Sequence, residues 1–223
     1  MALVRAHHFA ISLDGYGAGE GQSAEAPFGH AGTSLMEWFF STRLGRWVHG
    51  ESGGVRGLDD ALAEQDIPGI GAEIMGRNKF GPQRGPWADH EWRGWWGDEP
   101  PFRTPVVVLT HHARPVIEFD NGTSFHFVEA VPVDALATAR ALAAESGVGP
   151  DIRIGGGPST VRAFLEADLV DHLHLVMVPI VLGRGERLWS SGMEGLQERF
   201  DHVETISSPS GVVHIILTRA PRA

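Results

Sequence analysis

Residues 151–183 constrain the fold most, because they read as a strand, a glycine turn, a helix and a second strand in direct succession. Ile152 and Ile154 alternate with polar neighbours, which is the period-two pattern of a strand. Residues 155–157 are all glycine, and Pro158 occupies the first helical position, where a missing N–H is tolerated. Such a unit is a building block of α/β proteins with a parallel sheet.

The glycine turn predicts a phosphate site. Three glycines before a helix let backbone N–H groups approach a phosphate, and the helix dipole favours an anion there. We therefore expect the pyrophosphate of a nucleotide on this turn. The alternative is a glycine-rich turn that binds nothing, since a short glycine run is a weak signal alone. The residues that would hold the pyrophosphate are Gly156, Gly157, Ser159 and Thr160.

A second junction of the same kind follows residues 70–75, which read as a short buried strand. Gly76 ends this strand, and residues 77–80 begin a helix whose N-terminus is again free for an anion. Arg77 and Lys79 supply positive charge there; the alternative is that they are surface charges. The repetition of the junction favours a phosphate.

A third strand is predicted at residues 104–110, a continuous apolar run typical of a strand buried on both faces of a parallel sheet. Ligands of open α/β sheets bind at the carboxyl ends of the strands. The polar residues after this run are therefore placed for a phosphate or a ribose. They are Thr110, His111, His112 and Arg114.

Charge and composition exclude several classes of partner. The chain has 18 basic and 28 acidic residues, a formal net charge of −10, which disfavours nucleic acids and anionic membranes. It has no cysteine, so disulfides, thiol catalysis and cysteine-ligated metals are excluded. The longest apolar run, residues 175–182, is too short to span a bilayer. The first residues lack a signal-peptide pattern, so we expect a cytoplasmic protein.

The glycines between positions 15 and 21 predict a loop, interpreted either as a lid over a bound ring or as a loose surface loop. Residues 35–43 predict a buried helix. Its Glu37 would protonate a substrate nitrogen if burial raised its pKa; otherwise it is a solvated first-turn glutamate. Residues 81–101 hold four tryptophans among glycines and prolines, which predicts an ordered loop that packs on the domain or a second subunit, or else walls the substrate.

The remaining pattern completes the fold prediction. Residues 124–128 predict a strand and residues 132–146 an alanine-rich helix, and residues 199–206 and 211–217 predict a closing antiparallel hairpin. The sequence therefore predicts one α/β domain, residues 1–223, with a mixed, mostly parallel sheet and an antiparallel C-terminal edge.

We expect no metal site. His111 and His112 are neighbours that would point to opposite faces of a strand. His172 and His174 share a face, but the sequence names no third ligand for them.

Four segments in order carry a resemblance to a known family: SLDG at residues 12–15, IMGRNKF at 74–80, VVVLTHHAR at 106–114, and IRIGGGPSTVRAFLEADLVDHLHLVMVPIVLGRG at 152–185. Together they resemble the dihydrofolate reductase-like superfamily, in particular the riboflavin biosynthesis reductase domain at the C-terminus of the bifunctional deaminase–reductase. The resemblance extends from Val4 to Trp189 and implies a three-layer fold, NADPH as the cofactor, hydride transfer and a homodimer. The zinc deaminase signature is absent because the chain has no cysteine.

The resemblance implies a role for each matched position. Gly155, Gly156, Gly157, Ser159 and Thr160 match the pyrophosphate loop. Gly76 and Arg77 match the pair that holds the adenosine phosphates, with Lys79 in place of the usual threonine. Thr110, His111 and His112 match the segment around the 2′-phosphate and, with Arg77 and Arg114, favour NADPH over NADH. Ala10 falls where a backbone group bonds the nicotinamide carboxamide, and Gly17 belongs to the loop that closes over that ring.

The substrate side matches less well. Leu35, rather than an acid, stands at the position of the folate enzymes' proton donor. Glu37 is close in the sequence but lies at a different angle around the helix, so a folate reductase is disfavoured. Asp14 matches an acid of the riboflavin-type reductases; the alternative is an Asx-turn residue that caps the loop. The expected function is therefore an NADPH-dependent reductase resembling 5-amino-6-(5-phosphoribosylamino)uracil reductase, which acts on a small heterocyclic or carbonyl substrate. The alternatives are a dihydrofolate or pterin reductase and a nucleotide-binding protein without turnover.

Overall fold

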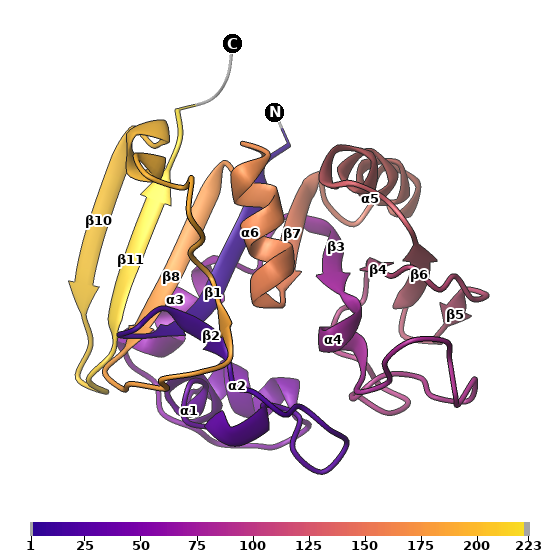
Figure 1. Ribbon diagram of the computed structural model, residues 1–223, viewed down its shortest axis with the longest axis horizontal. Helices are drawn as coiled ribbons and strands as arrows, with labels where there is room; N and C mark the ends of the chain where they lie inside the picture. The colour runs from indigo at the N-terminus through magenta and orange to yellow at the C-terminus, as the bar shows by residue number, and fades with distance from the viewer. Residues whose placement is uncertain (1, 221–223) are drawn as a thin grey trace.

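A nine-stranded sheet organises the protein, whose computed structural model describes residues 2–220. The strand order across the sheet is β10-β11-β8-β1-β7-β3-β4-β6-β5. The strands are β1 (Val4–Ser12), β3 (Ile70–Gly76), β4 (Pro105–Leu109), β5 (Ile117–Glu118), β6 (Ser124–Val128), β7 (Asp151–Gly156), β8 (His172–Val178), β10 (His202–Ser207) and β11 (Val213–Thr218). Figure 1 shows β10 and β11 at one edge and β5 and β6 at the other.

The six central strands, from β8 to β6, all pair in parallel. The additions at the two edges are antiparallel: β11 on β8, β10 on β11, and β5 on β6. The prediction of an α/β fold with a mixed, mostly parallel sheet and an antiparallel C-terminal hairpin is therefore confirmed.

Helices α5 (Pro132–Ser146) and α6 (Pro158–Glu166) pack on one face of the sheet, and Figure 1 shows α6 in front of the strands. Both begin with proline, and Gly147 ends α5 with a φ of 66°, a conformation that glycine adopts without steric cost. The apolar sides of both helices pack on the strands in the largest hydrophobic cluster. Val107 of β4 belongs to this cluster, whereas Val106 and Val108 face the opposite side, as the continuous apolar run predicts.

Two smaller clusters cover the opposite face. Beneath β1 and β8, Leu35 and Trp38 of the segment around α1 (Glu37–Phe40) pack on the sheet. The neighbouring helices are α2 (Arg43–Val48) and α3 (Leu58–Gln65), and the short 3₁₀ helices are η1 (Gly29–Ala31) and η2 (Leu196–Arg199). The predicted helix over residues 35–43 is therefore wrong in extent: the chain turns at Ser41 and Thr42, whose hydroxyls bond backbone carbonyls, and Thr42 caps α2.

The tryptophan-rich loop covers the other part of this face. It follows α4 (Arg77–Phe80) and packs on Phe125 and Phe127 of β6. The indole N–H groups of Trp87 and Trp92 donate to the carbonyls of His112 and Phe80, at 2.7 and 3.2 Å. The loop is thus ordered by packing on its own domain, as one of the two interpretations expected.

The glycine-rich segment after β1 is not a free loop. Tyr16–Ala18 forms a short strand, β2, which pairs with β9 (Glu186–Arg187) in a separate two-stranded sheet. The interpretation of this segment as a loose surface loop is wrong here, because β9, far away in the sequence, supplies a strand partner. None of the helices within residues 2–220 is long and apolar enough to cross a membrane.

Candidate functional site

The two strand–glycine–helix junctions lie side by side. The strands β3 and β7 are adjacent and parallel, with Ile74 paired to Ile154 and Met75 to Gly156. Their carboxyl ends therefore reach the same edge of the sheet, where α4 and α6 begin. A β-carbon on Gly76 would come within 2.5 Å of the Thr160 hydroxyl oxygen, so glycine is what allows the junctions to approach.

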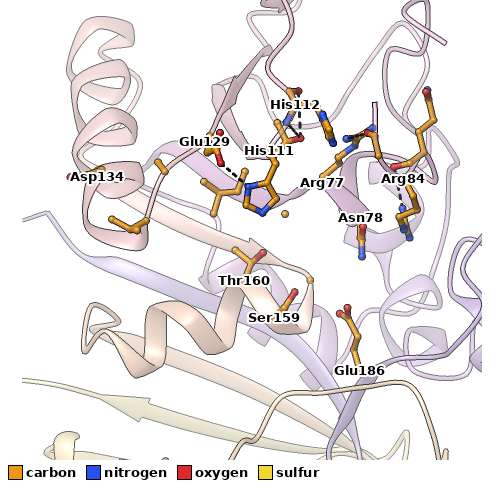
Figure 2. A pocket seen from close by; sticks show the side chains of 18 residues that line it. Arg77, Asn78, Arg84, His111, His112, Glu129, Asp134, Ser159, Thr160 and Glu186 are labelled. Carbon is orange, nitrogen blue, oxygen red and sulfur yellow. Dashed lines mark hydrogen bonds and ion pairs between the residues drawn. The ribbon is translucent and has the colours of Figure 1, made fainter. Parts of the chain in front are cut away.

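A cavity of about 710 Å³ opens between these junctions. Its size is typical of a site for a cofactor-sized ligand. Figure 2 shows Ser159 and Thr160 at the start of α6, across the cavity from Arg77 and Asn78 of α4. A second hollow of about 390 Å³ shares Asn78, Arg84 and Glu186 with it and reaches the Gly19–Gly21 segment. The predicted residues that line the main cavity are Gly76, Arg77, Thr110, His111, His112, Gly157, Ser159 and Thr160.

The glycine turn presents the start of α6 to the cavity. Gly155 and Gly156 complete β7, the peptide between Gly156 and Gly157 is cis, and Pro158 begins the helix. The N–H groups of a first helical turn have no acceptor within the helix. Ser159 is exposed at this end, so its hydroxyl and the first-turn N–H groups are available to an anion.

Arg77 brings a positive charge to the cavity. Its guanidinium carbon lies 3.7 Å from the centre of the Trp87 ring, and Nη1 donates to the Gly85 carbonyl. Nε and Nη2 are buried and have no hydrogen-bond partner within residues 2–220. The pKa of Arg77 is lowered, first by burial and then by the charges of Arg84 and Arg114. An anion in the cavity beside Arg77 would offset the repulsion by Arg84 and Arg114.

The segment after β4 forms another wall. Thr110 is buried, and its hydroxyl accepts from the His112 N–H at 3.1 Å. His111 is exposed and its Nδ1 lies 2.9 Å from Glu129 Oε1. All three predicted residues of this segment therefore line the cavity, with an acidic neighbour that the sequence did not indicate.

Two of the predicted cations, Arg114 and Lys79, do not line the cavity. Arg114 donates to the carbonyls of His90 and Trp92 and stacks on Trp87, so its guanidinium holds the tryptophan-rich loop. Lys79 donates to Glu73 Oε1 at 2.8 Å and to the Gly155 carbonyl at 2.7 Å. Neither cation lines the cavity, and acceptors within the domain bind Nζ of Lys79 and both Nη atoms of Arg114.

Ala10 and Gly17 lie beside the cavity rather than in its lining. Strand β1 pairs with β8 as far as Ser12 but with β7 only at Val4 and Arg5. The sheet, in the part described, therefore opens between the carboxyl ends of β1 and β7, and Ala10 lies on that open stretch. A β-carbon on Gly17 would come within 3.0 Å of Phe9 and Pro158, which brings β2 against the start of α6.

Neither of the two acids predicted as proton donors is a buried carboxyl group. Asp14 accepts from Ser12 Oγ at 2.6 Å and from the N–H groups of Leu182 and Gly183 at 3.1 and 2.7 Å. These hydrogen bonds, that from Ser12 foremost, lower its pKa to about 2. Asp14 thus ties the end of β1 to the 182–183 turn, which favours the turn-capping alternative. Glu37 is exposed in the first turn of α1, 3.4 Å from Thr33 Oγ1.

Several lining residues were not predicted. Asn78 directly follows the predicted Arg77 on α4, so its position at the junction could have identified it as a lining residue. Arg84 comes from a segment without periodicity, and Glu186 is brought in by β9, so neither could be placed before the fold was known. The unpredicted polar residues are Asn78, Gln83, Arg84, Glu129, Asp134 and Glu186.

Comparison with known proteins identifies the family of the chain. The family model described as the RibD C-terminal domain matches residues 6–213. No curated protein is similar enough in sequence to count as a match.

Solved structures share the fold at low sequence identity. A putative riboflavin biosynthesis protein from Shewanella sp. PV-4 is similar at a TM-score of 0.57 and 20% identity, covering 99% of this chain and 100% of that one. A pyrimidine reductase-like protein from Corynebacterium diphtheriae follows at 0.50 and 16%, covering 99% and 93%. A diaminohydroxyphosphoribosylaminopyrimidine deaminase/5-amino-6-(5-phosphoribosylamino)uracil reductase from Thermotoga maritima gives 0.56 and 13%; 98% of this chain matches 57% of that longer protein.

Proposed function

The chain belongs to the RibD C-terminal domain family, and on this basis we propose that it is an NADPH-dependent reductase of a small heterocyclic substrate. The observation that carries the proposal is the cavity between the two glycine junctions, with Arg77 among its lining residues. Such a site fits an extended anionic cofactor, because it joins a helix N-terminus to a fixed cation.

The residues of the cavity fit the parts of NADPH as follows. Gly157, Ser159 and Thr160 would hold the pyrophosphate at the start of α6. Arg77 would pair with the 2′-phosphate, with Thr110, His111 and His112 around the adenosine ribose. When bound, the cofactor supplies the hydride; the protein supplies orientation and a shielded site.

The nicotinamide end would extend toward the opening between β1 and β7. Backbone groups of β1 near Ala10 are available there, since the ladder with β7 stops at Arg5. Gly17, on β2, lies against Pro158 and would cover the nicotinamide end of the site. Within this proposal Asp14 and Glu37 are the predicted acids for any proton transfer. The ionised Asp14 carboxylate is suited to holding the 182–183 turn.

The substrate proposal follows the family. The Thermotoga maritima protein is named as a 5-amino-6-(5-phosphoribosylamino)uracil reductase, and we take this aminouracil as the first substrate to test. We also propose that the protein is a homodimer, with the expected location in the cytoplasm.

Cofactor binding and turnover test the proposal in two steps. Titration of the protein with NADPH should quench tryptophan fluorescence, with energy transfer to the nicotinamide, because Trp87 lies under Arg77. NADPH oxidation is then followed with the aminouracil substrate, dihydrofolate, and a panel of pterins and small carbonyl compounds. Oxidation with the aminouracil supports the proposal. Absence of binding to both NADPH and NADH contradicts it, and binding without oxidation favours a nucleotide-binding protein without turnover.

A further inference from the structure

Five histidines gather near one buried carboxylate on the face of the sheet that carries α1. Asp66 ends α3 and is 5% exposed. The histidines come from three strands that are distant in sequence, β1, β8 and β11. They are His7, His8, His172, His174 and His214.

A β-bulge brings the two adjacent histidines of β1 together. Between Ala6 and Phe9 strand β1 advances three residues while its partner β8 advances two, from Leu173 to Leu175. His8 has a φ of 56°, a left-handed conformation that is uncommon outside glycine. In a regular strand, neighbours point to opposite faces; the bulge instead lets His7 and His8 both reach Asp66.

The donor atoms are spaced as metal ligands are. One nitrogen of His7, one of His8 and one oxygen of Asp66 all lie within 4.8 Å of one another. His8 Nε2 is 3.5 Å from Asp66 Oδ2, and His172 Nε2 is 3.2 Å from Asp66 Oδ1. Bonds of about 2.0–2.1 Å to a tetrahedral ion place neighbouring ligand atoms roughly 3.4 Å apart.

These nitrogens also lack other partners. Within residues 2–220, both ring nitrogens of His7 are buried without a hydrogen bond, and Nε2 of His8 is buried with Asp66 as its neighbour at the long distance of 3.5 Å. Buried polar atoms are nearly always satisfied, and leaving one unsatisfied is costly. A metal ion would accept a lone pair from each ring.

A second set of residues orients the carboxylate. His174 Nδ1 lies 2.7 Å from Asp66 Oδ2, and its Nε2 lies 2.8 Å from His214 Nδ1. His214 Nε2 in turn lies 2.9 Å from Asp59 Oδ1. The Trp38 ring packs edge-on against His8 and His214 and shields the cluster. Such hydrogen-bonded outer residues and an apolar shell are typical of metal sites in proteins.

We propose that His7, His8 and Asp66 bind a divalent transition metal ion, with zinc the best match to two imidazoles and one carboxylate and a water molecule as the fourth ligand. Imidazole and carboxylate ligands without cysteine suit zinc, and also cobalt as a probe. Two cations whose charges act on the cluster are paired with carboxylates: Arg153, which acts on His7 and His8, with Glu73 at 3.2 Å, and Arg5, which acts on His7, with Asp151 at 2.8 Å. No residue of the cluster lines the cofactor cavity, so the metal site does not depend on the proposed cofactor residues.

Metal content is the direct test. The protein is produced without a histidine tag, stripped with a chelator, loaded with zinc, desalted and assayed by mass spectrometry; about one ion per chain is expected. Cobalt loading should give the visible absorption of a four-coordinate site with nitrogen and oxygen ligands. Loss of all metal on desalting would overturn the proposal.

Variants then locate the site. His7→Ala removes a ring that makes no hydrogen bond within the described residues, so folding should be kept while zinc affinity falls on the order of 100-fold. Asp66→Asn should have the same effect on zinc, with thermal unfolding monitored to check the fold. His202→Ala removes an exposed histidine of β10 and is the matched control, expected to bind zinc as the parent does. Unchanged zinc affinity in both His7→Ala and Asp66→Asn, or an equal loss in His202→Ala, would contradict the assignment.

Discussion

A β-carbon on Gly76 would lie 2.5 Å from Oγ1 of Thr160, so the two junctions that border the cavity touch at this point. In Gly76→Ala the Thr160 hydroxyl has to shift, either by rotation of its side chain or with the start of α6. Crowding of this kind costs about 1–3 kcal/mol of folding free energy. We expect NADPH affinity to fall roughly tenfold or more, since a loss of about 1.4 kcal/mol is tenfold in Kd.

Gly57→Ala is the matched control for this change. A β-carbon there meets no atom of the described residues within 4 Å, and Gly57 precedes α3, away from the cavity. Calorimetric titration with NADPH measures both variants. Equal affinities for Gly76→Ala and Gly57→Ala would show that the approach of the junctions does not matter for binding.

Arg77 is predicted to select NADPH over NADH. Arg77→Ala should lose a charge-assisted bond of about 2 kcal/mol to the 2′-phosphate, or roughly 30-fold in Kd for NADPH. Affinity for NADH, which lacks that phosphate, should change far less. Arg93→Ala is a close control, because Arg93 also stacks on an aromatic ring, that of Phe119, but does not line the cavity. Equal losses for the two cofactors in Arg77→Ala would refute the assignment.

Arg114 is predicted to act on stability rather than on cofactor choice. Its guanidinium bonds the carbonyls of His90 and Trp92 and stacks on Trp87 and Phe127. Arg114→Ala should lower the free energy of unfolding by about 1–3 kcal/mol. The ratio of the NADPH and NADH dissociation constants should stay that of the parent. A change in this ratio, measured by the same titration, would indicate instead that Arg114 contributes to binding of the 2′-phosphate.

The sequence predicted the elements of the sheet well because their signals are local. Residues 124–128 and 132–146 form β6 and α5 with the predicted boundaries. Alternation, apolar runs and terminal prolines act within a few residues, so no knowledge of the fold is needed to read them. The two glycine junctions were predicted for the same reason.

What the sequence could not show depends on contacts between distant segments. The pairing of β2 with β9 needs Glu186 next to Ala18, and the bonds of Lys79 need Glu73 and Gly155. The histidine cluster is the clearest case. His172 and His174 were recognised as sharing a face, but their partner Asp66 is more than 100 residues away in the chain.

Asp14 offers a test of its two interpretations by pH. Its pKa is about 2 in the folded protein against 3.8 for an ordinary aspartate, so the folded state favours the charged form. Its contribution to stability is therefore present above pH 3.8 and is lost as the pH falls toward 2. The amide proton shifts of Leu182 and Gly183, followed by NMR, should titrate with a midpoint near 2.

If Asp14 holds the turn, Asp14→Asn should shift and broaden those two amide signals without altering the pH dependence of kcat. A proton donor would instead show a loss of kcat and of one limb of the pH profile in this variant. That outcome would contradict the turn-capping interpretation.

Glu73 is predicted to stabilise the protein by balancing the charges of Lys79 and Arg153 beneath the glycine turn. It is 2% exposed on β3; Oε1 accepts from Lys79 Nζ at 2.8 Å and Oε2 from Arg153 Nη1 at 3.2 Å. Glu73→Gln would leave two largely buried cations without their counter-charge. Removing one partner from a buried ion pair costs about 3–5 kcal/mol, so we expect a loss of that size. Urea denaturation should show a lower midpoint with an unchanged slope.

Rescue distinguishes lost charge balance from lost packing. Adding Lys79→Met to Glu73→Gln removes one of the two uncompensated cations, so part of the lost stability should return. Glu204→Gln, on the exposed edge strand β10, is the control and should change stability by less than about 0.5 kcal/mol. If Glu73→Gln costs no more than this control, the buried charges are screened by solvent. If Lys79→Met fails to restore stability, Glu73 acts through packing against Gly155, where an added β-carbon would overlap its carboxylate.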